Sequence, residues 1–330
     1  MKPDSRSSSD WTRRDVVSMM ALAGASVPFA GFAVDAAAQT AASPPSTPTC
    51  IHALSKPLQW LSYAALAELM AETGYGGIDY TVRPGGHVVP ERVADDLPRA
   101  VELARKAGLK VEMITTAIVD PADPNTETIL KTAASAGVKY YRMGYLAYDG
   151  RLGIEASLQK HRAAMKGLAE LNRTYTIHGA YQNHAGGRVG GPVWDVYELL
   201  RDLDPRGIGC QYDVRHAVIE GFNSWPVGFR LLHPWIKCTD FKDFTWVQSA
   251  GGKWSAESVP AGEGAVDFDT YFKLVSELRV AGPISVHFEY PPFERATQAL
   301  SDAENRRVCA AAMRKDLAVL KGYLAKYQIA

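Results

Sequence analysis

The sequence has little cysteine, no excess of charge of either sign, and no short motif of the common nucleotide-binding folds. Its four cysteines, Cys50, Cys210, Cys238 and Cys309, lie far apart and form no CxxC pair, which argues against a disulfide framework or a zinc knuckle. Lysine plus arginine equals aspartate plus glutamate at 36 each, and no basic run stands out, so nothing indicates a nucleic-acid surface. With 330 residues, 47% of them hydrophobic and 22% charged, the chain is typical of a folded protein with a sizeable core.

Residues 1–38 are predicted to be an export signal. Arg13 and Arg14 are adjacent, and an apolar run from residue 16 to residue 34 follows them. Three alanines at 36–38 supply the small residues that signal peptidase accepts, so we expect cleavage before Gln39. The twin arginine resembles a bacterial Tat signal, and an uncleaved membrane anchor is the alternative. Residues 39–49 then form a flexible leader, and we expect a periplasmic or otherwise Tat-exported protein with no stable membrane insertion after cleavage.

From residue 50 to residue 330, short β-type runs alternate with amphipathic stretches. Eight such units match the size of a (β/α)8 barrel, and no GxGxxG follows the first strand, where a dinucleotide-binding sheet would carry it. We therefore predict a single (β/α)8 TIM barrel. Its strands are expected at 51–54, 77–81, 110–115, 138–142, 175–180, 207–212, 235–239 and 283–288. Its helices are expected at 63–73, 90–107, 125–136, 155–171, 193–203, 268–280 and 301–327, with a less regular one at 218–232.

Polar and ionisable side chains cluster where the predicted strands end. In a (β/α)8 barrel this end carries the active site, and at least six of the eight strands end in such groups. Individual residues have simpler interpretations: Arg142 could form a salt bridge at the rim, Asp79 could be a buried structural acceptor, and Trp246 could serve packing alone. The cluster as a whole predicts a site for a small polar molecule. Its candidate members are Lys56, Arg83, His87, Arg142, His178, Gln182, His184, Asp213, Arg215, His216, Asp240, Lys242, Trp246 and Glu289.

Four stretches carry a resemblance to a known family. They are residues 55–60 (SKPLQW), 77–87 (GIDYTVRPGGH), 242–246 (KDFTW) and 283–290 (PISVHFEY). Together with the strand endings, they resemble the exported bacterial sugar phosphate isomerase/epimerase group within the xylose isomerase-like TIM barrels. The resemblance covers nearly all of the chain after the signal, and it is specific for the group rather than for one reaction.

The resemblance implies one divalent metal held by Glu, Asp, His and Glu from strands five to eight. By position, these ligands fall on Gln182, Asp213, Asp240 and Glu289. An amide thus replaces one glutamate and a carboxylate replaces the histidine. The resulting all-oxygen set would favour Mn²⁺ or Mg²⁺ over zinc. The alternative is an acid-rich sugar site without metal, in which Lys242 and the histidines supply the positive charge.

The same resemblance implies a sugar isomerase or epimerase that removes a proton next to a carbonyl of a free or oxidised (keto) sugar. Because Gln182 removes one of two facing glutamates, we expect Glu289 as base and His184 or His216 as opposing acid, with Lys242 assisting. A lyase that β-eliminates from 3-keto-glycosides, or a keto-glycal hydratase, is the runner-up. A non-catalytic periplasmic sugar-binding protein is the third interpretation. The residues expected to hold the sugar are Lys56, Arg83, His87, Arg142, His178, Arg215 and Trp246.

Overall fold

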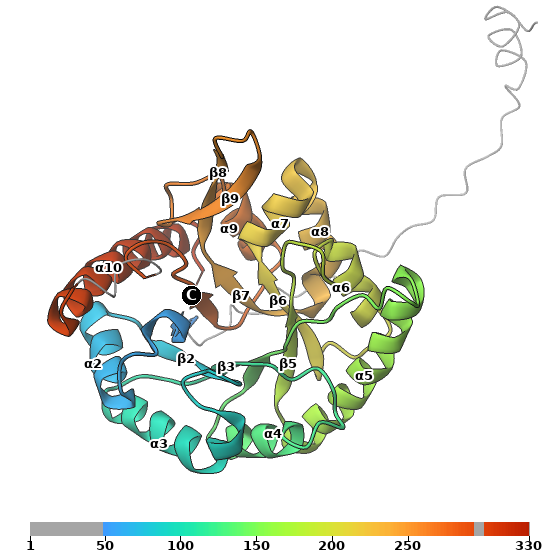
Figure 1. The fold of residues 1–330 in the computed structure, drawn as a ribbon, viewed down its shortest axis with the longest axis horizontal. Coiled ribbons are helices and arrows are strands. Elements are labelled where there is room, and N and C mark those ends of the chain that lie inside the picture. The colour runs from blue at the N-terminus through green and yellow to red at the C-terminus, as the bar shows by residue number, and fades with distance from the viewer. Residues whose placement is uncertain (1–48, 294–299, 330) are drawn as a thin grey trace, which may run out of the picture. The chain divides into compact units, whose positions relative to one another are not determined.

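A closed barrel of eight parallel strands organises the chain, as predicted (Figure 1). The computed structural model describes residues 49–293 and 300–329, so the predicted signal and nearly all of the leader lie outside the described residues. Hydrogen bonds link the strands in the order β1-β10-β7-β6-β5-β4-β3-β2, and β2 closes back on β1. The barrel strands are β1 (Ile51–Leu54), β2 (Gly77–Val82), β3 (Met113–Thr116), β4 (Tyr140–Arg142), β5 (His178–Gln182), β6 (Ile208–Asp213), β7 (Ile236–Phe241) and β10 (Ile284–Val286).

Helices cover the outside of the barrel (Figure 1). Several begin and end where the sequence supplies caps: Ser62 accepts a hydrogen bond at the start of α2, and Gly74 ends it in the left-handed region. Ser301 and Glu304 form a capping box at the start of α10. The helices are α2 (Tyr63–Thr73), α3 (Val93–Lys106), α4 (Thr126–Ser135), α5 (Ile154–Tyr175), α6 (Val193–Leu200), α7 (Val214–Gly221), α8 (Trp225–Leu232), α9 (Phe268–Glu277) and α10 (Asp302–Lys326).

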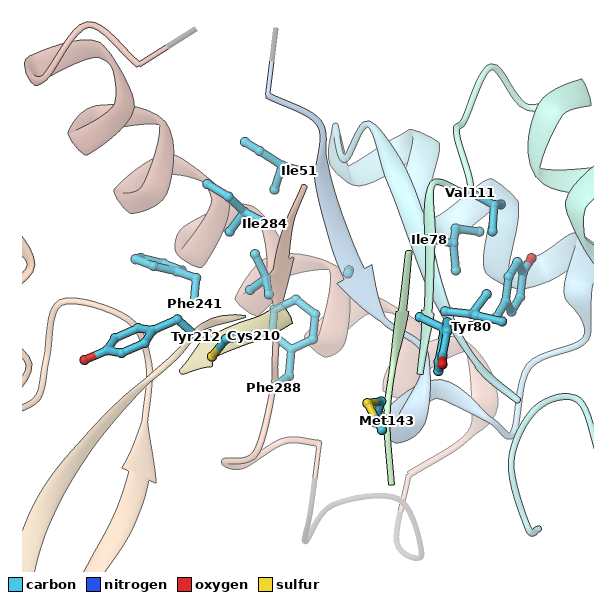
Figure 2. Close-up of a cluster of buried hydrophobic side chains, with 14 of the residues drawn as sticks. Ile51, Ile78, Tyr80, Val111, Met143, Cys210, Tyr212, Phe241, Ile284 and Phe288 are labelled. Atoms are coloured by element: carbon cyan, nitrogen blue, oxygen red, sulfur yellow. The ribbon is translucent and has the colours of Figure 1, made fainter. Parts of the chain in front are cut away.

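Two apolar regions support the barrel from either side of its wall. Outward-facing strand residues such as Ile78 and Tyr212 belong to a continuous buried cluster that includes the helix residues (Figure 2). Inward-facing Met113, Ala180 and Cys238 form a separate small cluster. Successive strand residues alternate between faces, so the next inward position on each strand lies one layer higher. This small cluster is therefore the floor beneath the polar end of the barrel.

The predicted fifth strand, 175–180, is placed too early in the sequence. Helix α5 continues to Tyr175, and Thr176 ends it in the left-handed conformation with φ 53°. The strand then runs from His178 to Gln182. The error matters for function because it assigns His178 to the wrong end of the barrel.

A two-stranded hairpin is the element that the sequence prediction missed. Strand β8 (Asp243–Gln248) pairs antiparallel with β9 (Trp254–Val259) after the end of β7, and in Figure 1 the hairpin projects beside α7. Asp243 secures its return loop by accepting hydrogen bonds from the backbone N–H groups of Phe244, Gly262, Gly264 and Val266.

Among the described residues, no helix is long and apolar enough to cross a bilayer.

Candidate active site

The candidate site begins one layer above the apolar floor. Gln182 ends β5, Asp213 ends β6 and Asp240 lies near the end of β7, all of them buried and facing inward. The Gln182 side-chain nitrogen donates to Asp213 Oδ2 at 2.8 Å and to Asp240 Oδ2 at 2.5 Å. Gln211 Nε2 donates to the other Asp240 oxygen at 2.6 Å. The strand ends therefore bring two buried carboxylates to one amide.

Asp213 also starts helix α7, which explains the spacing of Asp213 and His216. Its Oδ1 accepts a hydrogen bond from the His216 backbone N–H at 3.1 Å, the N-cap arrangement that satisfies a free helical N–H. Asn183 fixes the Asp213 backbone through two hydrogen bonds of 2.8 and 2.9 Å. The Asp-x-x-His pattern is thus a helix cap that places a histidine beside the capping carboxylate.

The amide of Gln182 is oriented by partners on both sides. Its Oε1 accepts hydrogen bonds from Arg142 at 3.1 Å and from the Tyr145 hydroxyl at 2.7 Å. Rotating the amide would set its N–H groups against these donors and its oxygen against the two carboxylates. Because buried polar groups without partners are costly, the four contacts hold the Gln182 N–H groups on the aspartates.

Lys242 places a buried ammonium group between three acceptors. Its Nζ lies 3.0 Å from Asp213 Oδ2, 3.0 Å from His216 Nε2 and 3.2 Å from Glu289 Oε2. Burial by itself would lower the pKa of Lys242, but Asp213, Glu289 and Asp240 outweigh it and raise the pKa above the ordinary value. In turn, Lys242 is the main reason that the pKa of Glu289 lies far below its usual range. The lysine is therefore charged, and Glu289 is held as a weakly basic carboxylate.

Two histidines stand in contact above this group. The rings of His184 and His216 have their centroids 3.8 Å apart. Burial and the neighbouring Lys242 lower the pKa of His216, so it is neutral at neutral pH. His184 donates from Nδ1 to the carbonyl oxygen of Ala185 at 2.9 Å, and no described residue bonds its Nε2. Since burial also lowers the pKa of His184, its Nε2 presents a free lone pair at the barrel mouth.

Cationic groups surround this centre. Arg142 is buried and bonded to Gln182, and the exposed Lys56 lies 3.4 Å from Glu289 Oε1. The guanidinium of Arg83 is half-buried, and nothing within the described part of the chain accepts a hydrogen bond from it. Burial and the charge of Arg142 lower the pKa of Arg83, which places its guanidinium in the same electrostatic environment. Arg83 and Lys56 therefore retain N–H groups for a ligand.

Two predicted sugar-binding residues lie elsewhere. His178 begins β5, four residues below Gln182, and its Nε2 meets the carbonyl oxygen of Pro205 at the opposite end of the barrel. The ring of His87 contacts Tyr63 and Tyr80 and bonds the backbone oxygen of Leu61. Tyr80 belongs to the outward-facing layer, so the ring of His87 lies among residues that face the helices rather than in the mouth.

Arg215 and Trp246 lie beside the mouth rather than in its centre. Arg215 NH1 is 3.3 Å from His216 Nδ1, and its guanidinium carbon lies 5.6 Å from the ring centre of Phe244. Trp246 packs edge-on against the same phenylalanine and is 41% exposed. Both side chains thus connect the hairpin to the site.

The sequence prediction overlooked Tyr145, Arg188 and Gln211. The Tyr145 ring lies between Arg142 and Arg188, whose guanidinium carbons are 4.7 and 4.6 Å from its centre. Tyr145 and Arg188 belong to the loops after β4 and β5, and their place after a predicted strand was the only indication in the sequence that they could lie at the site.

The hairpin had a clearer sequence signal, because Gly251 and Gly252 separate two alternating stretches of suitable composition.

The residues that could hold a metal do not fit one in this arrangement. Asp213, Asp240 and His287 each offer a ligand atom, and the three atoms lie within 4.8 Å of one another. Yet the carboxylates already accept hydrogen bonds from Gln182, and Asp213 also contacts Lys242. A cation between the two carboxylates would therefore meet these N–H groups, while Nε2 of His287 is buried and has no hydrogen-bond partner among the described residues.

A second group with metal-ligating atoms lies near the start of β1. It consists of Cys50, His52 and Glu112. His52 Nε2 accepts a hydrogen bond from the Glu112 backbone N–H, and its Nδ1 donates to the carbonyl oxygen of Cys50. Because both ring nitrogens bind the backbone, His52 acts as a structural residue there.

The chain belongs to the family of xylose isomerase-like TIM barrels. The family model matches residues 67–309, which is more than half of the 330 residues. The resemblance stated from the sequence motifs is confirmed at the level of the superfamily. Comparison with curated proteins gave no match.

Solved structures with the same fold include proteins of different activities. A probable 3-DHS dehydratase from Bacillus anthracis is 14% identical, with a TM-score of 0.63 and coverage of 83% of this chain and 99% of that one. A D-tagatose 3-epimerase-like protein is 16% identical, with a TM-score of 0.63 and coverage of 85% and 98%. A 3-keto-D-glucoside 4-epimerase from E. coli is 12% identical, with a TM-score of 0.59 and coverage of 83% and 99%. At these identities the likeness establishes the fold alone.

Replacing Gln182 by glutamate tests the amide geometry. Gln182→Glu would exchange the shared donor for a third carboxylate against Asp213 and Asp240, so we expect the free energy of unfolding to fall by about 3 kcal/mol or more at neutral pH. Since repulsion would raise the pKa of the new carboxyl group, the loss should grow as the pH rises from about 5.5 to about 8. Urea unfolding at both pH values measures it. Gln248→Glu on the exposed hairpin is the control, and an equally small effect at both positions would contradict the geometry.

Proposed function

We propose that the protein is a sugar isomerase-type enzyme that moves a proton at a carbon next to the carbonyl of a keto-sugar or free sugar. The observation that carries the proposal is His184, a neutral histidine with a free Nε2 at a mouth lined by cations. A proton α to a carbonyl becomes acidic enough to transfer when a base is positioned on it and positive charge faces the developing oxyanion.

His184 suits the role of base better than Glu289. Its Nδ1–H is bonded to Ala185, which leaves Nε2 as the unprotonated nitrogen with a basic lone pair and no bonded partner among the described residues. Glu289 was predicted as the base, but its contact with Lys242 lowers its pKa and so weakens it as a proton acceptor. We assign Glu289 instead to accepting hydrogen bonds from sugar hydroxyl groups.

In the proposed reaction, His184 takes the proton from the α-carbon and the electron pair of that C–H bond forms the carbon–carbon double bond of an enediolate. Arg83 and Lys56 have N–H groups available to bind the oxyanion. The former carbonyl oxygen then takes the proton of the α-hydroxyl group, and return of the carbon-bound proton from His184 to the former carbonyl carbon gives the isomer, in which the α-hydroxyl oxygen has become the new carbonyl oxygen. The sequence prediction of one divalent cation, Mn²⁺ or Mg²⁺, stays a prediction for this site, and the proposed steps take their positive charge from side chains.

The predicted export signal guides the choice of sugar. Sugar phosphates are chiefly cytoplasmic, whereas Arg13, Arg14 and the following apolar run predict a periplasmic or otherwise exported protein. We therefore propose an unphosphorylated substrate, either a free sugar or a keto-glycoside.

A second candidate reaction follows from the asymmetry of the site. Gln182 stands where the resemblance implies one of two facing glutamates, so among the described residues His184 is the base left free at the mouth, as one-sided proton removal requires. On a 3-keto-glycoside, the same removal can be followed by cleavage of the β carbon–oxygen bond. The C–H electron pair then forms the double bond, and the departing oxygen takes a proton. This is the β-eliminating lyase, and its reverse is hydration of a keto-glycal.

Hydrogen exchange tests the proposed function directly. The protein should incorporate one deuterium at the carbon next to the carbonyl when a panel of free and 3-keto sugars is incubated in heavy water, as followed by NMR. Exchange with an isomeric product supports the isomerase, and exchange with loss of the anomeric group supports the lyase. Binding of a sugar without exchange in any member would identify a sugar-binding protein and contradict the proposal.

The role of His184 predicts a particular pH profile. Because burial holds the pKa of His184 below 6.5, exchange should be independent of pH above about pH 7 and fall as the solution becomes more acidic. His184→Gln should slow exchange by about 100-fold or more. His161→Gln is the matched control, since His161 also bonds one backbone carbonyl through one ring nitrogen, at a site outside the mouth. Equal rates for the two variants would exclude His184 as the base.

A further inference from the structure

We propose that the ammonium group of Lys242 is the resident cation of this site and takes the place of a divalent metal. The inference deepens the proposed function only in one respect: the reaction then proceeds without metal. The other part of the inference is that the protein folds with its buried charges balanced around Lys242. This part does not depend on which substrate the protein binds.

The contacts of Lys242 match the number of hydrogens that an ammonium group carries. Asp213 and Glu289 provide carboxylate acceptors at 3.0 and 3.2 Å, and His216 Nε2, at 3.0 Å, accepts the third N–H in the tautomer that leaves Nε2 unprotonated. Two of these acceptors, Asp213 and Glu289, are predicted metal ligands. The side chain is almost fully buried, so its charge must be matched by nearby groups of opposite sign. The carboxylates and the lysine therefore compensate one another.

Asp240, another predicted metal ligand, already accepts hydrogen bonds from N–H donors on both of its oxygens. Asp240 receives Gln182 on one oxygen and Gln211 on the other. His287 Nε2 lies 3.1 Å from the latter oxygen but forms no hydrogen bond with it. A metal bound to Asp240 would displace these donors and leave buried amide hydrogens without acceptors.

The orientation of the Gln182 amide also agrees with a site in which Lys242, rather than a metal, is the cation. Its oxygen, the atom that a metal would need, faces Arg142 and Tyr145 and is held there by both. For its oxygen to bind a metal, the Gln182 amide would have to rotate and give up its contacts with four polar partners. Moreover, a divalent ion bound to Asp213 would lie close to the Lys242 ammonium, and the two charges would repel strongly at low dielectric.

A manganese titration of the full chain tests the inference. Purified wild-type protein should retain full thermal stability and any exchange activity after dialysis against EDTA, and it should bind no Mn²⁺ at micromolar concentrations by electron paramagnetic resonance. Lys242→Met should lower the melting temperature because it leaves Asp213 and Glu289 without their shared cation. That variant should then bind Mn²⁺ at least about tenfold more tightly than wild type and regain part of its melting temperature in Mn²⁺.

Lys273→Met is the matched control, because Lys273 forms an exposed ion pair with Glu277 on α9 and its loss should change neither quantity. One Mn²⁺ bound per wild-type chain with micromolar or tighter affinity would overturn the proposal, as would a Lys242→Met variant with unchanged melting temperature. If Lys242→Met does not fold, the wild-type titration alone decides. An absence of sugar exchange contradicts the proposed function but not this inference, and manganese binding by wild type contradicts this inference but not the proposed function.

Discussion

The need to balance buried carboxylates at one barrel mouth determines the structure of the site. Asp213 and Asp240 approach one another because parallel strands deliver inward residues to the same end of the barrel, and the partly exposed Glu289, which follows β10, joins them through Lys242. Like charges in a buried site are unfavourable unless donors and cations compensate them. Lys242 and Gln182 supply that compensation.

This balance divides the polar side chains into two sets with different uses. One set is fully engaged with protein: Gln182, Asp213, Asp240 and Lys242 bond one another and their neighbours. The other set keeps free donors or lone pairs, namely Lys56, Arg83 and His184. The side chains of the first set fix the geometry and the electrostatic field of the barrel mouth. The side chains of the second set can contact a ligand. Such prior organisation is what proton removal from a weak carbon acid requires.

Sequence reasoning recovered the barrel because alternating short apolar runs and amphipathic stretches are a local signal repeated eight times. The prediction was wrong where the exact start of a strand mattered. Because α5 continues to Tyr175 and ends at Thr176, the fifth strand starts later than predicted, and His178 had been assigned to the wrong layer of the barrel. It also missed Tyr145, since no local pattern distinguishes a loop residue that lies between two arginines. The motif positions of Asp213 and Asp240 were readable, but the replacement of lone pairs by N–H donors around them was not. That property depends on Gln182 from β5, Gln211 from β6 and Lys242 after β7 meeting the two aspartates at once.

The central claim is that a lysine ammonium occupies the position between the site's carboxylates. Crystals of the full chain grown in millimolar Mn²⁺ and measured at the manganese absorption edge test it most directly. The account predicts no anomalous peak between Asp213, Asp240 and Glu289, with Lys242 Nζ within hydrogen-bonding distance of Asp213 and Glu289. An anomalous peak at that position, with the Gln182 oxygen turned toward it and Lys242 displaced, would contradict the account.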